Sequence, residues 1–307
     1  MSLESAFRTI HTMQVGVIVP MAQVDVPDAR PTWGGIRSFA ASAEEAGIDS
    51  LWVLDHFFHA PTDGAVEGML ESWTTLTALA AVTERVRIGS IVLCAGFRPP
   101  GLLAKMAATA DEVSDGRLIL GLGAGWHDAE YEAFGFPTDR RVARLEETLR
   151  VIRPLLDGSR VTFDGSFVSL HDAVLAPPPL HRVPLLIAGE GPRMLRLAAE
   201  HADAWNTAWY GAPNEHVIAR FVAFADALAA TGRDPEEVAR TVGVRVAGPS
   251  ARPTDDDDEP LFVGSVDELA RALDAYESLG ADHLIVGLEP ITASSLEHLC
   301  AALALRG

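Results

Sequence analysis

The chain has 307 residues, of which 48% are hydrophobic and 22% charged, and its formal net charge is −19 at pH 7. These proportions suit a globular protein built as one large barrel or as two smaller domains, and so negative a chain is not expected to bind nucleic acid or an anionic membrane surface. Two cysteines without a Cys-x-x-Cys spacing exclude a disulfide framework. No apolar run reaches the ~18 residues of a membrane span, and the first residues lack a signal-peptide pattern, so a soluble cytoplasmic protein is expected.

Short apolar segments alternate with amphipathic segments along the chain. The apolar segments are rich in Val, Ile and Leu and are bounded by Gly, Pro or Asp, as expected for strands buried on both faces. They lie at residues 14–20, 50–55, 86–93, 117–123, 184–189, 203–206, 241–248 and 283–288. Amphipathic segments with a helical period lie at residues 35–47, 71–86, 99–116, 192–202, 214–231, 265–280 and 291–305.

This alternation predicts a single α/β domain, a (β/α)8 TIM barrel over residues 1–307. A doubly wound open sheet would show the same alternation, but its Gly-rich turn is absent after the first strand. Residues 124–183 are interpreted as an insertion after strand four, on the face that carries the chemistry of such barrels. It holds an extra helix at 141–156 and a hairpin around Asp164-Gly165. Residues 248–264 form a polar loop, with four aspartates at 255–258 in a solvated tip.

Asp55 and His56 follow strand two, at the end where a barrel places its ligands. A histidine there can act as an acid, a base or a hydrogen-bond donor. Structural roles remain equally open, with Asp55 as a cap and His56 as a packed ring. A third alternative is a metal site formed by Asp55, His56 and His59.

Strands three and four lead to further candidates at the same end of the barrel. Cys94 is expected to be a small buried hydrophobe, and Arg98 to lie above the mouth, where it can meet an anion or solvent. Strand four ends in GLGAGWH (121–127), whose glycines permit close approach of a planar ring beside Trp126 and His127.

Strand five opens directly into a helix through IAGEGPR (187–193). Free backbone N–H groups at the start of that helix, with Arg193, can bind one phosphate. A plain Gly-rich turn is the alternative. Trp205 and Asn206, at the end of strand six, can line the same mouth or belong to the core.

Together these segments resemble the luciferase-like monooxygenase family, and most closely its branch of F420-dependent oxidoreductases. The resemblance is dense over residues 14–206. It is carried by AEEAGIDSLWVLDHFFH (43–59), ESWTTLTALAAVTERVRIGSIVL (71–93), FRPPGLLAKMAATADEVSDGRLILGLGAGWHDAEYEAFGFP (97–137), RLEETLRVIRPLL (144–156) and PLLIAGEGPRMLRLAAEHADAWN (184–206).

The resemblance implies a barrel whose mouth binds coenzyme F420 or, alternatively, FMN. Asp55 and His56 match the family's Asp-His beside the ring, and Ile91-Val92 aligns with a non-prolyl cis peptide behind it. Residues 189–193 match the phosphate-binding turn. The residues expected to bind the cofactor are Ile91, Val92, Cys94, Gly123, Ala124, Trp126, His127, Ala188, Gly189, Glu190, Gly191, Pro192 and Arg193.

Two positions depart from the sugar-phosphate dehydrogenases of this branch. Ala124 stands where they carry a glutamate, and His59-Ala60-Pro61 stands where they carry a tryptophan. These differences argue against the sugar-phosphate reaction and leave His56 or His127 for proton transfer.

The prediction is hydride transfer between F420 and a small organic substrate, with Asp55 and His56 as catalytic residues, no metal, and a homodimer by family likeness. Within the class, the alternative is an FMN-dependent monooxygenase with a flavin reductase as partner. From other classes, a metal-dependent barrel hydrolase and a cofactor-free binding barrel remain.

Overall fold

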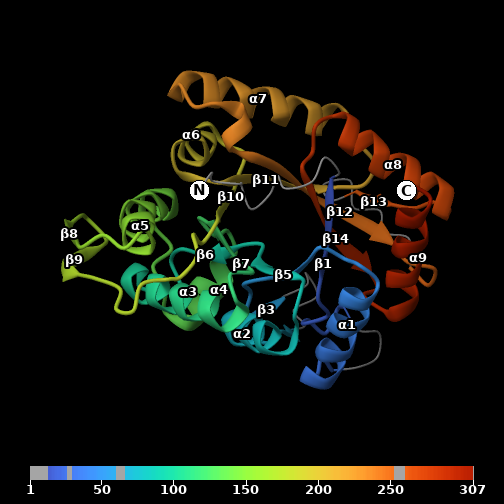
Figure 1. Ribbon diagram of the computed structural model, residues 1–307, viewed down its shortest axis with the longest axis horizontal. Helices are drawn as coiled ribbons and strands as arrows, with labels where there is room; N and C mark the ends of the chain where they lie inside the picture. Colours follow the sequence, from blue (N-terminus) through green and yellow to red (C-terminus); the bar gives the residue numbers. More distant parts are fainter. Residues whose placement is uncertain (1–12, 26–29, 60–65, 252–259, 307) are drawn as a thin grey trace.

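A computed structural model describes residues 13–25, 30–59, 66–251 and 260–306, with the backbone alone at His59 (Figure 1). Each barrel strand runs parallel to its neighbours in chain order, and the first pairs with the last, which closes the cylinder. The predicted (β/α)8 barrel is confirmed, and the open sheet is excluded. The barrel strands are β1 (Gln14–Ile18), β2 (Ser50–Val53), β5 (Arg87–Ser90), β7 (Leu118–Gly123), β10 (Leu185–Ala188), β11 (Ala204–Tyr210), β12 (Ala239–Ala247) and β14 (His283–Glu289).

A helix follows each barrel strand and covers the outside of the cylinder (Figure 1). Side-chain oxygens of Thr32, Asn214, Ser265 and Thr292 accept N–H groups of the first turn and so fix where four of these helices begin. The helices are α1 (Trp33–Glu45), α2 (Ser72–Val82), α3 (Pro100–Ser114), α5 (Arg141–Leu156), α6 (Pro192–His201), α7 (Glu215–Thr231), α8 (Val266–Ser278) and α9 (Ala293–Ala304). Within the described residues, no helix is long and apolar enough to span a membrane.

The interpretation of residues 141–156 as an extra helix is wrong. This segment is α5, the regular helix of the fourth unit, and it packs between α3 and α6. The additions are α4 (Asp128–Phe134) and a hairpin of β8 (Val161–Asp164) and β9 (Ser169–Ala173).

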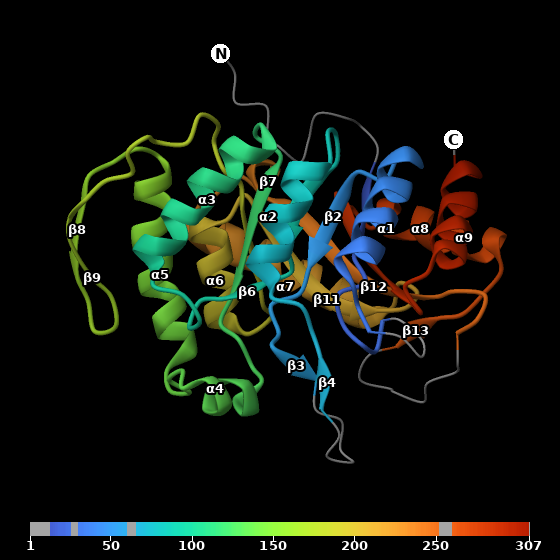
Figure 2. The ribbon, with the colours of Figure 1, turned by 90° about the horizontal axis from the view of Figure 1, so that it is seen from below.

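The predicted hairpin exists. It leaves the last residue of α5, at the end remote from the mouth, and folds back along this helix. Its turn packs on the first half of α5, where Glu147 accepts the Phe167 N–H and Arg144 lies over the Phe167 ring. Figure 2 shows β8 and β9 outside α5, at one edge of the molecule. The part of the insertion that lies at the mouth is α4 with its flanking loops.

Short strands not predicted from the sequence decorate the barrel. An antiparallel ribbon joins β3 (Phe58–His59) to β4 (Glu67–Gly68), and Figure 2 shows it at the same end as α4. The strand β6 (Leu93–Cys94) extends β7, and β13 (Leu261–Phe262) extends β12. A 3-10 turn at Pro235–Glu237 precedes β12. The four aspartates at 255–258 lie outside the described residues.

Buried side chains fill the barrel interior beneath the mouth. Trp52 is fully buried, and its indole N–H donates to Ser50 Oγ at 2.7 Å. Ser50 Oγ lies 2.8 Å from Nε2 of His283 in β14, the strand on the other side of β1. Because these side chains close the interior, a ligand has access to the strands only at their carboxyl ends.

Candidate functional site

A pocket of about 360 Å³ opens at the carboxyl ends of the barrel strands. This volume is that of a small-molecule site. Predicted residues that line it are Asp55, His56, Ile91, Val92, Cys94, Gly123, Ala124, Trp126, Ala188, Gly189 and Glu190. Lining residues absent from the predicted set are Leu54, Gly125, Met194, Asn206, Thr207, Ala208 and Trp209. Four predicted residues, His127, Gly191, Pro192 and Arg193, lie outside this lining.

A larger cavity of about 690 Å³ lies beside it, between α3, α5 and the hairpin. None of the predicted cofactor-binding residues lines it. It is lined by residues of α3, α5, the hairpin and the loop after β6, and neither His56 nor the turn before α6 reaches it. We therefore place the candidate site in the smaller pocket.

Asp55 is a buried carboxylate whose oxygens are both occupied. Arg98 donates Nη1–H to Oδ2 at 2.7 Å and Nη2–H to Oδ1 at 2.9 Å, and the Cys94 N–H donates to Oδ2 at 2.8 Å. Burial by itself would lower the pKa of Arg98, but hydrogen bonds and charge pairing with Asp55 and Glu71 raise it. Arg98 is therefore an internal partner of Asp55, not the free anion-binding or solvent-facing side chain expected from the sequence.

The end of β5 makes one wall of the pocket. The Ile91-Val92 peptide is cis, as the resemblance implied, and Val92 packs on β7 so closely that a Cβ on Gly123 would lie 2.5 Å from Val92 Cγ2. A second non-prolyl cis peptide joins Ala208 to Trp209. Burial raises the pKa of Cys94 to about 12, so its thiol stays protonated and inert.

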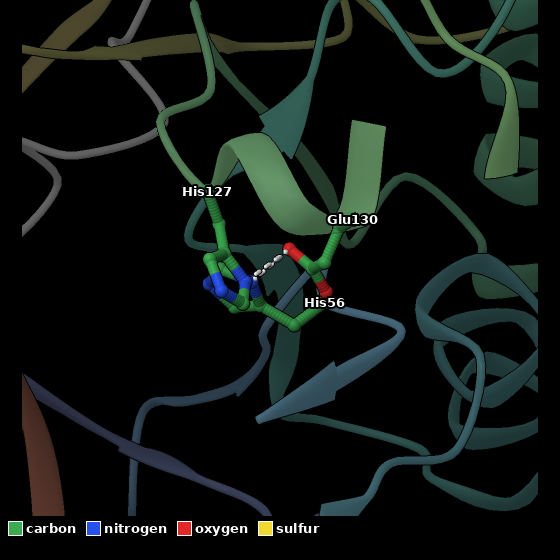
Figure 3. Close-up of side chains that lie close together, drawn as sticks. All are labelled: His56, His127 and Glu130. Atoms are coloured by element: carbon green, nitrogen blue, oxygen red, sulfur yellow. Dashed lines mark hydrogen bonds and ion pairs between the residues drawn. The ribbon is translucent and has the colours of Figure 1, made fainter. Parts of the chain in front are cut away.

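His56, Glu130 and His127 form a close set at the mouth (Figure 3). Nδ1 of His56 lies 2.8 Å from Glu130 Oε2, and Nδ1 of His127 lies 3.2 Å from the same oxygen. The Glu130 side chain is 1% exposed, and His56 is 25% exposed. One buried carboxylate therefore contacts both imidazoles.

The other oxygen of Glu130 is held by the backbone. Oε1 accepts the N–H groups of Phe57 at 2.5 Å and Phe58 at 3.2 Å. Burial would raise the pKa of Glu130, but the donors His56, Phe57 and Phe58 outweigh it, and the net shift is downward. Glu130 is thus an anion, and a carboxylate accepts only, so Nδ1 of His56 must carry the hydrogen of their hydrogen bond.

His56, His127 and Glu130 are also a group of described residues whose ligand atoms lie close enough, within 4.8 Å, to hold a metal ion. A metal would have to displace both imidazoles from Glu130 Oε2. The metal site considered from the sequence has a different composition. The Asp55 oxygens are bound by Arg98 and Cys94, and the side chain of His59 lies outside the described residues.

The turn before α6 leaves backbone donors free of side-chain caps. Gly191 is the N-cap residue, no side chain caps this helix, and Pro192 occupies its first turn. A Cβ on Gly191 would meet nothing within 4 Å, so open space adjoins these N–H groups. Arg193 is paired with Glu146 at 2.6 Å, so an anion here would rely on the backbone.

Of the side chains beside this turn, Glu190 and Asn206 line the pocket and Trp205 belongs to the core. Glu190 accepts from Thr207 Oγ1 at 2.6 Å and pairs with Arg220 at 2.9 Å. Trp205 is fully buried and donates its indole N–H to the Gly189 carbonyl at 2.9 Å, whereas Asn206 lines the pocket.

A sequence model of the luciferase-like monooxygenases matches residues 13–250. The chain belongs to the luciferase-like monooxygenase family. The resemblance drawn from the sequence is thereby confirmed. One solved structure in this luciferase-like fold is an F420-dependent secondary alcohol dehydrogenase in complex with an F420-acetone adduct. It aligns with a TM-score of 0.81 at 20% identity, over 96% of this chain and 99% of that one.

Two relatives illustrate the luciferase-like family at higher identity. An F420-dependent glucose-6-phosphate dehydrogenase of Kineococcus radiotolerans is 34% identical over 219 residues, which are 70% of this chain and 64% of that protein. A phthiodiolone/phenolphthiodiolone dimycocerosates ketoreductase of Mycobacterium sp. strain JLS is 34% identical over 257 residues, 77% of this chain and 67% of that protein. The match thus spans less than two thirds of the length of the first relative.

Proposed function

We propose that this luciferase-like protein transfers a hydride between coenzyme F420 and a small organic substrate. The observation that carries the proposal is one pocket at the strand ends that joins His56, the Ile91-Val92 bulge and the turn before α6. Relatives whose names specify F420 support the choice of coenzyme.

The residues present fit a planar ring with an anionic tail. The pocket is narrow and largely apolar, with Val92 on one side and Trp209 among its lining residues. The open space at Gly191 adjoins the amino end of α6, where backbone N–H groups and the helix dipole favour a phosphate. When bound, F420 supplies the hydride chemistry, so the protein needs to supply binding, orientation and one proton.

His56 is the residue proposed to hold that proton. Its Nδ1–H is bound to Glu130, which leaves Nε2 as the atom that accepts or donates. Ala124 offers no carboxyl group, so the proton transfer falls to an imidazole. Asp55, which was expected to be catalytic, is proposed to position the loop of Cys94 and Arg98, because its oxygens are already bound.

The test is a titration of the cofactor-free protein with F420 and with FMN, each oxidised and reduced, followed by fluorescence or calorimetry. We expect micromolar binding of F420 and much weaker binding of FMN. The reverse preference would support the monooxygenase alternative, which has the same kind of ring pocket and needs a flavin reductase as partner. Binding of neither would contradict both.

Two further expectations are part of the proposal, a homodimer and a cytoplasmic location. They rest on likeness to the family and on sequence composition. Analytical ultracentrifugation of the purified chain tests the first. Metal analysis of the same sample tests the hydrolase alternative, whose ligands were expected to be Asp55, His56 and His59. It equally tests the group of His56, His127 and Glu130 that the structure brings together.

A further inference from the structure

Packing alone does not explain the position of the Glu130 carboxylate. It comes from α4, whereas His56 follows β2, and the two residues are 74 positions apart. A fully buried carboxylate is costly unless it is bound, and this one accepts three hydrogen bonds. One donor is the imidazole of His56 (Figure 3), and the other two are backbone N–H groups that hold the carboxylate in place. His127 Nδ1 lies 3.2 Å from the same oxygen as His56.

We propose that Glu130 is the positioning residue of the acid–base histidine, His56. This inference rests on the proposed function, because it explains how His56 is made ready for proton transfer. Glu130 is buried behind the imidazoles and does not line the pocket, so it acts through His56 and not on the substrate.

The first consequence concerns which nitrogen of His56 faces the chemistry. With Nδ1–H fixed on Glu130, neutral His56 has its lone pair on Nε2 and acts as a base there. Protonated His56 donates from the same atom. The carboxylate also stabilises the imidazolium, as an opposite charge within hydrogen-bonding distance does.

The second consequence concerns His127, which lies beside the same carboxylate oxygen. Its Nδ1 is 3.2 Å from Glu130 Oε2, and the ring centroids of His56 and His127 are 6.2 Å apart. His127, the more distant of the two from Glu130 Oε2, is not among the residues that line the pocket.

The other charged groups around the set do not compete for this proton. Asp55 is neutralised by Arg98, which donates to both of its oxygens. Burial raises the pKa of Cys94 to about 12 and that of Tyr131 well above its ordinary value, so both stay neutral near pH 7.

The experiment reads the histidines directly, in cofactor-free protein labelled with ¹⁵N-histidine, by NMR across pH 5–9. Signals are assigned with His56→Gln and His127→Gln. In wild type we expect the neutral ring of His56 to carry its hydrogen on Nδ1. In Glu130→Gln the amide can donate to Nδ1, so the tautomer of His56 shifts toward Nε2–H.

The matched control is Glu132→Gln, which removes an exposed carboxylate from the same helix. It should leave the tautomer of His56 as in wild type. Should Glu130→Gln fail to fold, His127→Gln is the second variant. It leaves Glu130 Oε2 to His56 alone, so His56 should keep its hydrogen on Nδ1. Glu130→Asp keeps the charge and should restore part of the wild-type behaviour.

The outcomes separate this inference from the proposed function. In F420-dependent turnover, Glu130→Gln should lower kcat at least tenfold with little change in KM. Unchanged histidine signals in Glu130→Gln, or a His56 hydrogen on Nε2 in His127→Gln, would overturn the positioning role, whether or not the wild type uses F420. A wild type inert toward F420 contradicts only the proposed function. Stoichiometric metal bound through the imidazole nitrogens would overturn the hydrogen-bonded assignment.

Discussion

Arg98 donates hydrogen bonds to both carboxylate oxygens of Asp55, at 2.7 and 2.9 Å, and the Asp55 side chain is almost fully buried. The ion pair ties the end of β2 to the loop that begins α3. The same carboxylate accepts the N–H of Cys94, so it also fixes the short strand β6. A bidentate arginine–carboxylate pair with this burial is a rigid support for the pocket wall.

We predict that Asp55→Asn destabilises the protein by about 3 kcal/mol or more, because it leaves the buried Arg98 without its main counter-charge. Urea unfolding followed by circular dichroism measures this. The matched control is Asp172→Asn, which removes the charge of an exposed carboxylate 2.8 Å from Arg160. An exposed pair contributes at most about 1 kcal/mol, so equal losses in the two variants would contradict the structural role given to Asp55.

His56→Asn should lower kcat of the F420-dependent reaction about 10²- to 10⁴-fold, the usual contribution of a positioned acid or base. The F420 dissociation constant should change little, because His56 is one of many lining residues. His216→Gln, on the exposed face of α7, is the control and should behave as wild type. Loss of F420 binding without loss of turnover per bound complex would point to a binding role instead.

Gly191→Asp should move stability and cofactor affinity in opposite directions. The Gly191 backbone is extended, at φ −69° and ψ 153°, and its side-chain position is open, so an aspartate there can cap α6. Capping adds a few tenths of a kcal/mol to stability. The new carboxylate also occupies the proposed phosphate site and should weaken F420 binding at least tenfold. A rise in melting temperature with unchanged affinity would show that the phosphate binds elsewhere.

Asp25 should make stability depend on pH. Burial, aided by the charges of Glu289 and Glu67, raises its pKa from 3.8 to about 6 against the pull of backbone hydrogen bonds from Ala22 and Met21. A group whose pKa is raised in the folded state stabilises it below the unfolded value and loses that contribution as pH rises through about 6.

The variant Asp25→Asn tests this sign. Asparagine stays neutral and can still accept the Ala22 N–H through its carbonyl oxygen. It should therefore be more stable than wild type at pH 8, by up to about 3 kcal/mol, and nearly equal to it at pH 4. Urea unfolding at both values measures the difference. A variant that loses more stability at pH 8 than at pH 4 would show that the carboxylate is needed in its charged form, and would contradict this prediction.

The elements that the sequence predicted best are those set by local patterns. Apolar runs bounded by Gly, Pro or Asp marked all eight barrel strands, and Asp164-Gly165 marked the hairpin between β8 and β9. The position of Asp55 and His56 at the mouth followed from strand parity and barrel geometry, which are also local. The boundaries were less certain. The strand β11 continues to Tyr210, four residues past its predicted end, and so carries Trp209 into the pocket.

The partners of these residues could not be predicted, because each depends on contacts between distant segments. Arg98 reaches Asp55 across 43 residues, and Glu130 reaches His56 across 74. No spacing rule links such positions. Glu130 also lies in α4, a helix of seven residues, too short to show a helical period. Burial turns these side chains into fixed partners, and burial is a property of the assembled barrel.

A substitution at Gly89, in β5, tests how tightly side chains fill the barrel interior. A Cβ on this residue would lie 2.3 Å from Cζ3 of Trp52. Trp52 is buried, and its indole has no room to move away from the added methyl group. Gly89→Ala should therefore cost about 1–3 kcal/mol through overpacking. The control is Gly34→Ala in α1, where a Cβ meets nothing within 4 Å and alanine should add about 0.5–1 kcal/mol. Thermal unfolding of the two variants should thus show shifts of opposite sign. Equal stabilisation by both would mean that the indole of Trp52 can move, and that the barrel interior is less rigid than the packing of β2 against β5 implies.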